Sequence, residues 1–492
     1  MLTVAEIKSF IDADATSEKK QFAKVGQRYY ESDHDILRHR LFYFNADGKL
    51  VEDKTRSNIK IPHPFFTELV DQLPAYMLSF TENPIRAKEK VEGLQDYLDE
   101  YFDEDFWQEI SDLIAGAYSK GFEYIYAYKN AEDRLAFECA NSMGVVEVRA
   151  KDTDDHCEYV IYWYTDRIDK GKKEIKRIQV WNEKETHYFV QVNNGKIVPD
   201  ETEEHNPRPH IVFTDDETGE KMGLPLGYIP FWRLDNNKKQ ISGLKPIKAQ
   251  IDDYDMQMCG LSNNLADFDT PLHFVSGFQG DNLDELQVNL KTKKIVAVPD
   301  AEGSIDIKTV DIPYQARKEK AELDEKNIYR FGMGFNSSQV GDGNITNVVI
   351  MSRYTLIDLK ATNLQRRLNK VLKSIIKVVL DEINEKHGTD YQCKDIKFDF
   401  PRSIPSNETE NIENEKAKAE TKQIEVNTIL NIAANVGDEQ TLKALCEVMD
   451  WDFEGLKSQI ENLKEEQNTA AAKAALDAVV TDPIDPVTPE ED

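Results

Sequence analysis

The strongest constraint on the fold of this chain is an unbroken helical pattern over residues 348–387. At 1.5 Å per residue, a helix of that length extends for about 60 Å. Its apolar residues are spaced 4-3-4-3-4, which is typical of a coiled-coil seam and suits side-by-side packing of several copies of the chain. The residues of this seam are Ile357, Ala361, Leu364, Leu368, Val371 and Ile375.

A different pattern occupies residues 121–213. Short stretches rich in aromatic and β-branched residues, such as 124–128 and 159–164, alternate there with turn residues. This composition predicts an antiparallel meander, and Asn193-Asn194-Gly195 is its clearest hairpin turn. Long helices combined with such a meander predict an α+β fold.

Helical spacing recurs in several other parts of the chain. Thr3 and Glu6 fit a capping box at the start of the first helix, and Pro74 is expected to kink or divide the second. The predicted helices cover residues 3–30, 63–80, 91–119, 244–268, 315–331 and 408–467. The predicted smaller elements are a hairpin at 41–51 turning at Asn45-Ala46-Asp47-Gly48, strands at 272–275 and 294–298, a short helix at 283–290, and a strand with a Pro-bounded turn at 394–405.

Charge and composition exclude several classes of protein. The 492 residues include 91 acidic and 61 basic ones, for a formal net charge of −30, which argues against a protein that wraps nucleic acid tightly. The five cysteines form no CxxC pair, so we expect free thiols and a reducing compartment. No apolar run is long enough for a signal peptide or a membrane span, so we expect a soluble protein that is cytosolic when made.

Motifs of catalysis are missing from the sequence. It contains no GxxxxGK[ST], HExxH or GxSxG motif, and Gly332-Met333-Gly334 lacks the context of a dinucleotide site. The histidines are predicted to be ordinary surface residues. A two-metal nuclease site is one alternative, but most of its candidate ligands lie on one predicted helix, so no metal, cofactor or catalytic residue is predicted. These candidates are Asp252, Asp253, Asp255, Asp267 and Asp269.

Ten short motifs, taken in order, resemble those of a known family. They are Tyr30-Glu31-Ser32-Asp33-His34-Asp35-Ile36-Leu37, Asn58-Ile59-Lys60-Ile61-Pro62-His63, Leu69-Val70-Asp71-Gln72, Asn83-Pro84-Ile85, Tyr118 with Gly121, Glu123 and Tyr124, Ile229-Pro230-Phe231, Asn236-Asn237, Leu244-Lys245-Pro246-Ile247, Ile251-Asp252-Asp253-Tyr254-Asp255 and Ser262-Asn263-Asn264. Over residues 25–400 the chain resembles the portal proteins of tailed double-stranded DNA phages, in particular siphoviruses of Gram-positive hosts. It departs from them at Glu82, where that family usually has Gly.

The resemblance implies the portal fold, with wing, stem, clip and crown. Its segments would be a wing of helices and β meander at 1–243, a stem helix at 244–268, a clip at 269–313, a second stem helix at 314–331, the tunnel loop, long wing helix and strand at 332–405, a helical crown at 406–467 and an acidic tail at 468–492. The composition of that tail predicts disorder.

The function that the resemblance implies is that of a DNA conduit rather than an enzyme. Twelve copies would form a ring at one capsid vertex of the virion, after assembly in the host cytoplasm, and double-stranded DNA would be packaged, retained and ejected through it. The implied partners are the terminase motor, the head-completion adaptor, and the capsid and scaffold proteins, with no membrane. The alternative is a metal-dependent DNA-processing enzyme of the packaging machinery.

Electrostatics agrees with a conduit, because an acidic wall repels the duplex and makes few phosphate ion pairs that translocation must break. The resemblance places a small, polar loop along the channel, where its amides and hydroxyls would contact DNA weakly. The residues of this predicted tunnel loop are Asn336, Ser337, Ser338, Gln339, Gly341, Asp342, Gly343, Asn344 and Thr346.

Two charged segments remain open to two interpretations each. Nine acidic residues and no Lys or Arg between 92 and 112 predict a solvated face, or else a face that meets a basic partner or repels DNA. Four basic residues of the long helix are spaced 4-3-4 and therefore share one helical face. This face either pairs with acids of a neighbouring copy, for example those of 91–119, or in part faces DNA. This basic face comprises Arg366, Lys370, Lys373 and Lys377.

Overall fold

The computed structural model falls into two compact units, which are described separately: residues 1–342 with 351–404, and residues 343–350 with 405–492. The residues that the structure describes are those up to 459, except 55, 89–90, 92, 131–133, 152–156, 169, 194, 215–220, 269–271, 277–303, 309–313, 337–346, 403–407, 450–452 and 454.

Two helices open the chain, α1 (Val4–Ala15) and α2 (Glu18–Tyr30). The predicted capping box is confirmed, because the Thr3 side chain accepts from the Glu6 backbone while Glu6 accepts from that of Thr3. The single helix predicted over 3–30 is wrong. Its break occurs where Ser17 becomes the N-cap of α2 and accepts a hydrogen bond from the Lys20 backbone.

The meander is antiparallel, as predicted, but it forms two main sheets rather than one. One has the order β10-β9-β8-β7-β6, with β11 also pairing with β9, and the other has the order β14-β4-β5. The turn predicted at 193–195 falls between β9 and β10, which pair antiparallel, and its central residue Asn194 lies outside the described residues. The strands are β4 (Phe122–Lys129), β5 (Leu135–Ala140), β6 (Val145–Val148), β7 (Tyr159–Ile168), β8 (Lys173–Trp181), β9 (Glu185–Val192), β10 (Ile197–Pro199), β11 (Arg208–Pro209) and β14 (Phe231–Asp235), with a separate pair β12 (Ile211–Thr214) and β13 (Lys221–Leu224).

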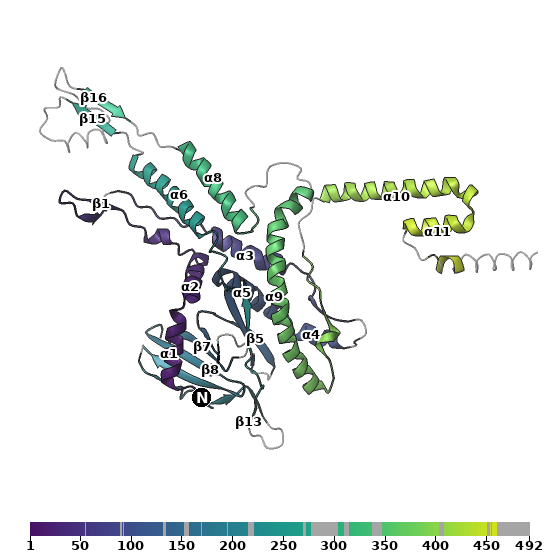
Figure 1. Ribbon diagram of the computed structural model, residues 1–492, viewed down its shortest axis with the longest axis horizontal. Coiled ribbons are helices and arrows are strands. Elements are labelled where there is room, and N and C mark those ends of the chain that lie inside the picture. Colours follow the sequence, from purple (N-terminus) through teal and green to yellow (C-terminus); the bar gives the residue numbers. More distant parts are fainter. Residues whose placement is uncertain are drawn as a thin grey trace, which may run out of the picture. The chain divides into compact units, whose positions relative to one another are not determined.

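Of the next three helices, α3 (Phe65–Met77), α4 (Leu94–Tyr101) and α5 (Glu104–Lys120), it is α5 that packs on the sheet of β4, β5 and β14, while α3 packs on α5 (Figure 1). The single helix predicted over 91–119 is wrong, because Asp103 caps a new helix and accepts from the Phe106 backbone. Pro74 lies inside α3 without dividing it. Seven of the nine acids in this stretch are exposed on α4 and α5 or at the cap between them, in agreement with the predicted solvated face: Asp96, Asp99, Glu100, Asp103, Glu104, Asp105 and Asp112.

Helices α6 (Lys248–Phe268) and α8 (Tyr314–Phe331) lie side by side and run in opposite directions (Figure 1). The chain between them includes β15 (Leu272–Ser276), which pairs antiparallel with β16 (Ser304–Lys308). The strand predicted at 272–275 is thereby confirmed. The strand predicted at 294–298 and the short helix predicted at 283–290 lie outside the described residues.

The long helix is confirmed as α9 (Asn347–His387), with 41 residues. All six residues of the predicted seam are buried in the large core that also includes Leu69, Ile110 and Leu244. The expectation that this seam packs against another copy is therefore wrong, because its apolar side chains already pack within their own chain. A short sheet of β3 (Ile85–Ala87) and β17 (Ile396–Phe398) adds a further strand near the position predicted for 394–405.

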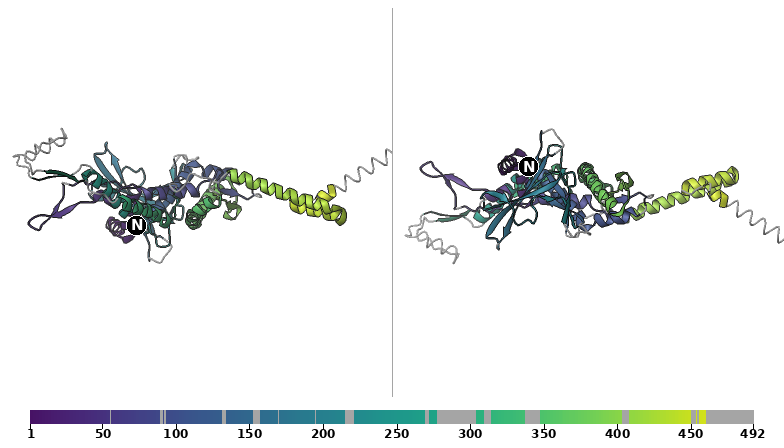
Figure 2. Two further views of the ribbon diagram at one scale, coloured as in Figure 1. Left: turned by 90° about the horizontal axis from the view of Figure 1, so that it is seen from above. Right: turned by 90° about the horizontal axis from the view of Figure 1, so that it is seen from below.

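The second unit contains two helices, α10 (Glu408–Val436) and α11 (Asp438–Met449), which fold back on each other about Gly437 (Figure 2). Gly437 has a φ of +92°, a backbone conformation that favours glycine. The helical region predicted over 408–467 is thus present as α10 and α11 as far as residue 449, and residues 453 and 455–459 are helical as well. The predicted disordered tail lies outside the described residues.

Candidate functional site

The segment that leads into the predicted tunnel loop is held by three parts of the fold. Helix α8 ends at Phe331, and the carbonyl of Gly332 then accepts two hydrogen bonds. One comes from the Tyr118 hydroxyl on α5 at 3.0 Å, and the other from Lys360 Nζ on α9 at 3.1 Å. Of the nine predicted loop residues only Asn336 lies within the described residues; the other eight lie outside them.

The next residues are clamped equally closely. Gln72 on α3 binds the backbone of Phe335 twice, donating to its carbonyl at 2.8 Å and accepting from its N–H at 2.9 Å. The Phe335 ring stacks on Tyr354 of α9, with ring centroids 4.7 Å apart. Asn336 donates to Glu325 of α8 at 3.0 Å. The chain therefore enters the predicted loop from a fixed point.

Glycine is required at this anchor for steric reasons. A Cβ on Gly334 would lie 2.0 Å from Leu69 Cδ2, and one on Gly332 would lie 2.6 Å from Leu69 Cδ1. The short GxG run that fails as a dinucleotide motif thus has a packing role, because the backbone passes directly over α3.

Lys360 lies in an unusual electrostatic environment within this anchor. Its side chain is only 9% exposed, and its Nζ lies 4.3 Å from the ring centroid of Tyr118. Burial lowers the pKa of Lys360 to about 7. Lys360 is one of the basic residues of the long helix, and its spacing from Ile357 and Leu364 places it on the buried side, a signal that the prediction of the basic face did not use.

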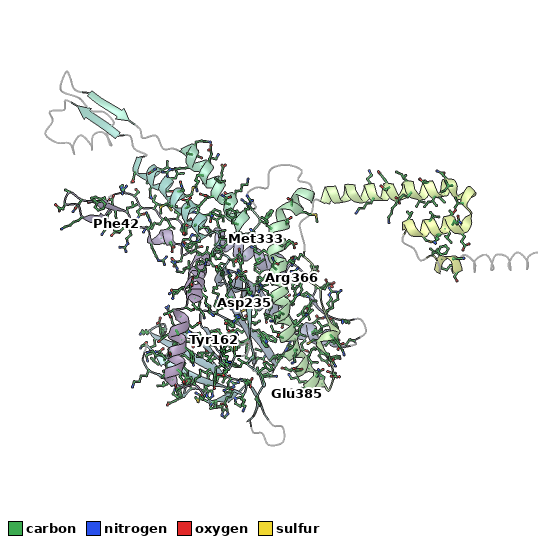
Figure 3. All side chains as sticks on the ribbon, viewed as in Figure 1. Phe42, Tyr162, Asp235, Met333, Arg366 and Glu385 are labelled. Carbon is green, nitrogen blue, oxygen red and sulfur yellow. The ribbon has the colours of Figure 1, made fainter. Side chains whose placement is uncertain are left out.

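The predicted basic face is present on α9. Arg366, Lys370, Lys373 and Lys377 are all exposed, and none of them forms an ion pair with another described residue. Arg366 and Lys370 also border a cavity of about 1030 Å³ between α9, β14 and residues 235–246. Figure 3 labels Arg366 on α9 and Asp235 at the end of β14. The described residues do not bring this face into contact with Asn336 of the predicted loop.

The cations beside that cavity that do not lie on α9 are already neutralised within the chain. Arg233 binds Glu147 and Asp235, and Arg149 also binds Glu147. The cations of this region that lack such partners among the described residues are therefore concentrated on α9.

A buried cluster connects α6 with the N-terminal part of the chain. Asp255 accepts from His34 Nδ1 at 2.7 Å and from His63 Nδ1 at 2.8 Å, and the His34 ring stacks on Tyr29 at 4.4 Å. Burial alone would raise the pKa of Asp255, but the hydrogen bonds from the two histidines outweigh it and lower that pKa. The prediction that His34 is an ordinary surface residue is wrong, since its side chain is fully buried.

The aspartates considered as metal ligands are held by other groups. Asp252 binds Tyr29 and Lys248, Asp253 binds Lys320, and Asp267 accepts from the Ser57 backbone at 3.1 Å. Asp269 lies outside the described residues. Among the described residues, no three His, Cys, Asp or Glu side chains are placed to hold a metal ion. The alternative of a metal-dependent enzyme therefore has no support.

An extended segment lies along α6 with regular spacing. The backbone N–H groups of Ser57, Ile59 and Ile61 donate to side chains at every fourth position of α6, which are Asp267, Asn263 and Cys259. Two extended residues advance about 6.7 Å and four helical residues about 6 Å, so the two repeats nearly match. The motifs 30–37, 58–63, 251–255 and 262–264, which carry the sequence resemblance, thus meet in one place.

No helix within the described part of the chain is both long and apolar enough to cross a membrane.

Known proteins match this chain over most of its length. The profile of the family described as "Phage portal protein, SPP1 Gp6-like" matches residues 9–473. The portal protein of Bacillus phage SPP1 is 23% identical over 387 residues, which cover 78% of this chain and 75% of that relative. The portal protein of Clostridium phage phiCD119 is 24% identical over 428 residues, covering 83% and 88% respectively. Because the family profile spans nearly the whole sequence, this chain belongs to the SPP1 Gp6-like family of phage portal proteins.

Proposed function

We propose that this protein is the subunit of a ring-shaped DNA channel at one capsid vertex, through which a phage genome is packaged, retained and ejected. The observation that carries the proposal is the family match over residues 9–473. The net charge of −30 supports it, because an acidic channel wall keeps DNA centred without binding it.

The elements can be assigned to the parts of a portal. The antiparallel pair α6 and α8 would be the stem, and the β15–β16 hairpin between them would belong to the clip, over residues 269–313. The sheets, α1 to α5 and most of α9 would form the wing, and α10 and α11 the crown. The order of these elements along the chain supports this assignment.

The partners follow from the same role. Twelve copies would form the ring in the virion, where the clip would dock the terminase motor during packaging and the head-completion adaptor afterwards. Capsid and scaffold proteins would surround the ring. The edges of the two-stranded β15–β16 hairpin support a docking role, since unpaired strand edges can accept another chain.

The tunnel loop, residues 336–347, would face the DNA. Its support is the anchor formed by Tyr118, Lys360 and Gln72, which fixes the point where the loop starts. A fixed base would let small polar residues move with the passing duplex while the rest of the subunit stays in place.

The basic face of α9 would pair with acids on a neighbouring subunit. Its exposure, together with the exposed acids of α4 and α5, favours this role over DNA contact. The net repulsion between an acidic channel and DNA also favours placing the unpaired cations at a protein interface.

Imaging of the purified protein tests the proposal. We expect ring-shaped particles, and twelve chains of 56.5 kDa would give a mass of about 680 kDa by native mass spectrometry. A protein that remains monomeric at high concentration, with or without DNA, would contradict it.

A further inference from the structure

The basic face of α9 is a helix face without a partner among the described residues. Residues 361–380 contain five basic residues and no acidic one. The face lies on the side of the helix opposite Leu364 and Leu368, which are buried in the core. In a chain with a net charge of −30, so much unneutralised positive charge on one helix points to an acidic protein surface as its partner.

The same chain carries an acidic groove elsewhere on its surface. It has a volume of about 880 Å³ and is bordered by α3, residues 80–83, the end of α4 and α5, and we call it the α3–α5 groove. No described Lys or Arg lines it. Its six acidic side chains are all exposed, and among the described residues only Glu82 forms an ion pair, with Arg86. These acids are Asp71, Glu82, Asp99, Asp103, Glu104 and Asp112.

Aromatic rings line the same groove. Phe80 and Trp107 meet edge to face, with ring centroids 4.9 Å apart, and both side chains are half-buried. Lys and Arg bury their aliphatic stems against such rings, while their charged ends reach neighbouring carboxylates. The α3–α5 groove therefore suits the side chains of a basic helix.

The two surfaces face away from each other within one subunit. Gln108 and Asp112 line the groove from the side of α5 that lies opposite Ile110 and Ile114. Those two isoleucines belong to the same buried core as the seam of α9. The core therefore separates the groove from the basic face, and the two cannot pair within one chain. Surfaces on opposite sides of a subunit can meet between successive copies, in the head-to-tail contact that closes a ring.

The charges on the two surfaces repeat at similar intervals. Glu104 and Asp112 are eight residues apart on α5, or about 12 Å, and Lys370 and Lys377 are seven residues apart on α9, or about 10.5 Å. Two helices laid side by side bring both pairs of opposite charges within reach together, because Lys side chains are long and flexible.

We propose that the basic face of α9 in each copy packs into the α3–α5 groove of the next copy. The inference rests on the ring proposed above and names the surface that receives the basic face. It assigns the contact to Asp71 and Glu82 as well as to acids of α4 and α5. It leaves out Asp96 and Asp105, which are exposed acids of the same two helices outside the groove.

An exchange of charges tests the contact in the full-length protein. A face variant carries Arg366→Glu and Lys370→Glu, and a groove variant carries Glu104→Lys and Asp112→Lys. Each alone should need about tenfold more protein for half-maximal ring assembly, measured by mass photometry, because like charges then meet at every contact. An equimolar mixture should assemble nearly as the unmodified protein does, since alternation of the two variants places opposite charges at every contact.

The matched control variant carries Asp96→Lys and Asp105→Lys, which change the net charge by the same amount at exposed positions outside the groove. It should assemble like the unmodified protein and should not restore the face variant in a mixture. Rescue by the groove variant alone would exclude a general effect of net charge. Normal assembly of the groove variant, or a mixture that fails to assemble, would overturn the proposal.

A second test measures proximity between copies. One population carries Gln108→Cys in the groove and the other Lys373→Cys on the basic face, both with the exposed Cys393 changed to Ser. The two populations are assembled together and treated with a short bismaleimide. We expect crosslinked dimers in the mixture and none in either population alone. Intact mixed rings without such dimers would exclude the contact.

The outcomes separate this inference from the proposed function. If the unmodified protein forms no ring, the portal-ring proposal itself fails. If it forms rings and the groove variant forms identical rings that capsids fail to incorporate, the groove binds a capsid protein and the inference between copies is wrong. If the face variant forms identical rings that fail to package DNA, the basic face contacts DNA and the inference is equally wrong.

Discussion

Lys360 is a buried amine at the point where the long helix meets the start of the predicted loop. A charged lysine at this depth destabilises the fold, because its one described hydrogen bond, to the carbonyl of Gly332, replaces only part of its lost hydration. Its pKa of about 7 in the folded protein lies far below the ordinary value of 10.5. Between about pH 7 and pH 10, Lys360 has therefore lost its proton in the folded protein but keeps it in the unfolded chain.

This difference predicts how stability changes with pH. Between about pH 7 and pH 10 the unfolded state binds more protons, so Lys360 should make the free energy of unfolding rise by about 1.4 kcal/mol per pH unit. Lys360→Met should remove this pH dependence. The variant should have the higher free energy of unfolding near pH 7, and its difference from the unmodified protein should shrink as pH rises. Urea unfolding at pH 7, 8 and 9 measures it. Lys373→Met, on an exposed position of the same helix, should keep the original profile, and identical profiles for both variants would refute the prediction.

The carboxylate of Asp255 predicts the opposite dependence. Its pKa is lowered in the folded state, so its contribution is present above the ordinary pKa of 3.8 and is lost as pH falls toward the folded value. Asp255→Asn should cost about 3 kcal/mol at neutral pH, because the buried His34 and the partly buried His63 lose their charged partner. Asp253→Asn on the same helix should cost less than about 1 kcal/mol, since its pair with Lys320 is exposed. Similar losses for the two variants, measured by denaturant unfolding, would contradict this account.

At the scale of elements, sequence patterns predicted which segments are helical better than what those segments contact. The long helix followed from apolar spacing, and the antiparallel strands followed from stretches of aromatic and β-branched residues separated by turn residues. The seam of α9 had the right spacing for a partner helix, but spacing does not distinguish a neighbouring copy from the core of the same chain. The break at Asp103 was missed because one capping side chain outweighed continuous helical spacing.

The same limit applies to the candidate site. The loop composition and the basic face could be read from the sequence, because each lies within one short segment. The anchor could not, since Tyr118, Gln72 and Lys360 come together only through long-range packing. The burial of His34 was missed for the same reason, as Asp255 is 221 residues away in the sequence.

The basic face of α9 gives a prediction about assembly. Reversing the charge with Arg366→Glu and Lys370→Glu should weaken the ring, and the effect should shrink in high salt because exposed ion pairs are screened. Lys8→Glu, at an exposed position of α1, serves as the control and should have little effect. Mass photometry at low and high salt measures the outcome. Normal rings that fail to package DNA would instead favour contact between this face and DNA.

The tunnel loop gives a prediction about function. Replacing Gly341 and Gly343 by Pro should leave the ring intact but impair packaging or retention of DNA, because Pro restricts the backbone freedom that glycine provides. Packaging is measured as DNA protected from nuclease inside capsids. Normal packaging by this variant, with rings confirmed by imaging, would show that the loop needs no such freedom.

At the scale of the whole molecule, the C-terminal tail is expected to be dispensable for assembly. The tail beyond Thr469 is rich in acidic residues and proline, so it cannot bury enough apolar surface to order itself. Deleting residues 469–492 should therefore leave ring assembly unchanged in mass and yield. Loss of the ring on this deletion would assign the tail a structural role.

The extended segment on α6 is cut to the length of the helix that it follows. Every second backbone N–H from Ser57 to His63 donates to every fourth side chain from Asp267 back to Asp255. Two extended residues advance about 6.7 Å and four helical residues about 6 Å, and a twisted strand shortens enough to absorb the difference of about 0.7 Å per step. The register ends at Asp267 because α6 ends at Phe268, so the helix acts as a ruler that sets where the chain departs to form the hairpin at residues 42–52.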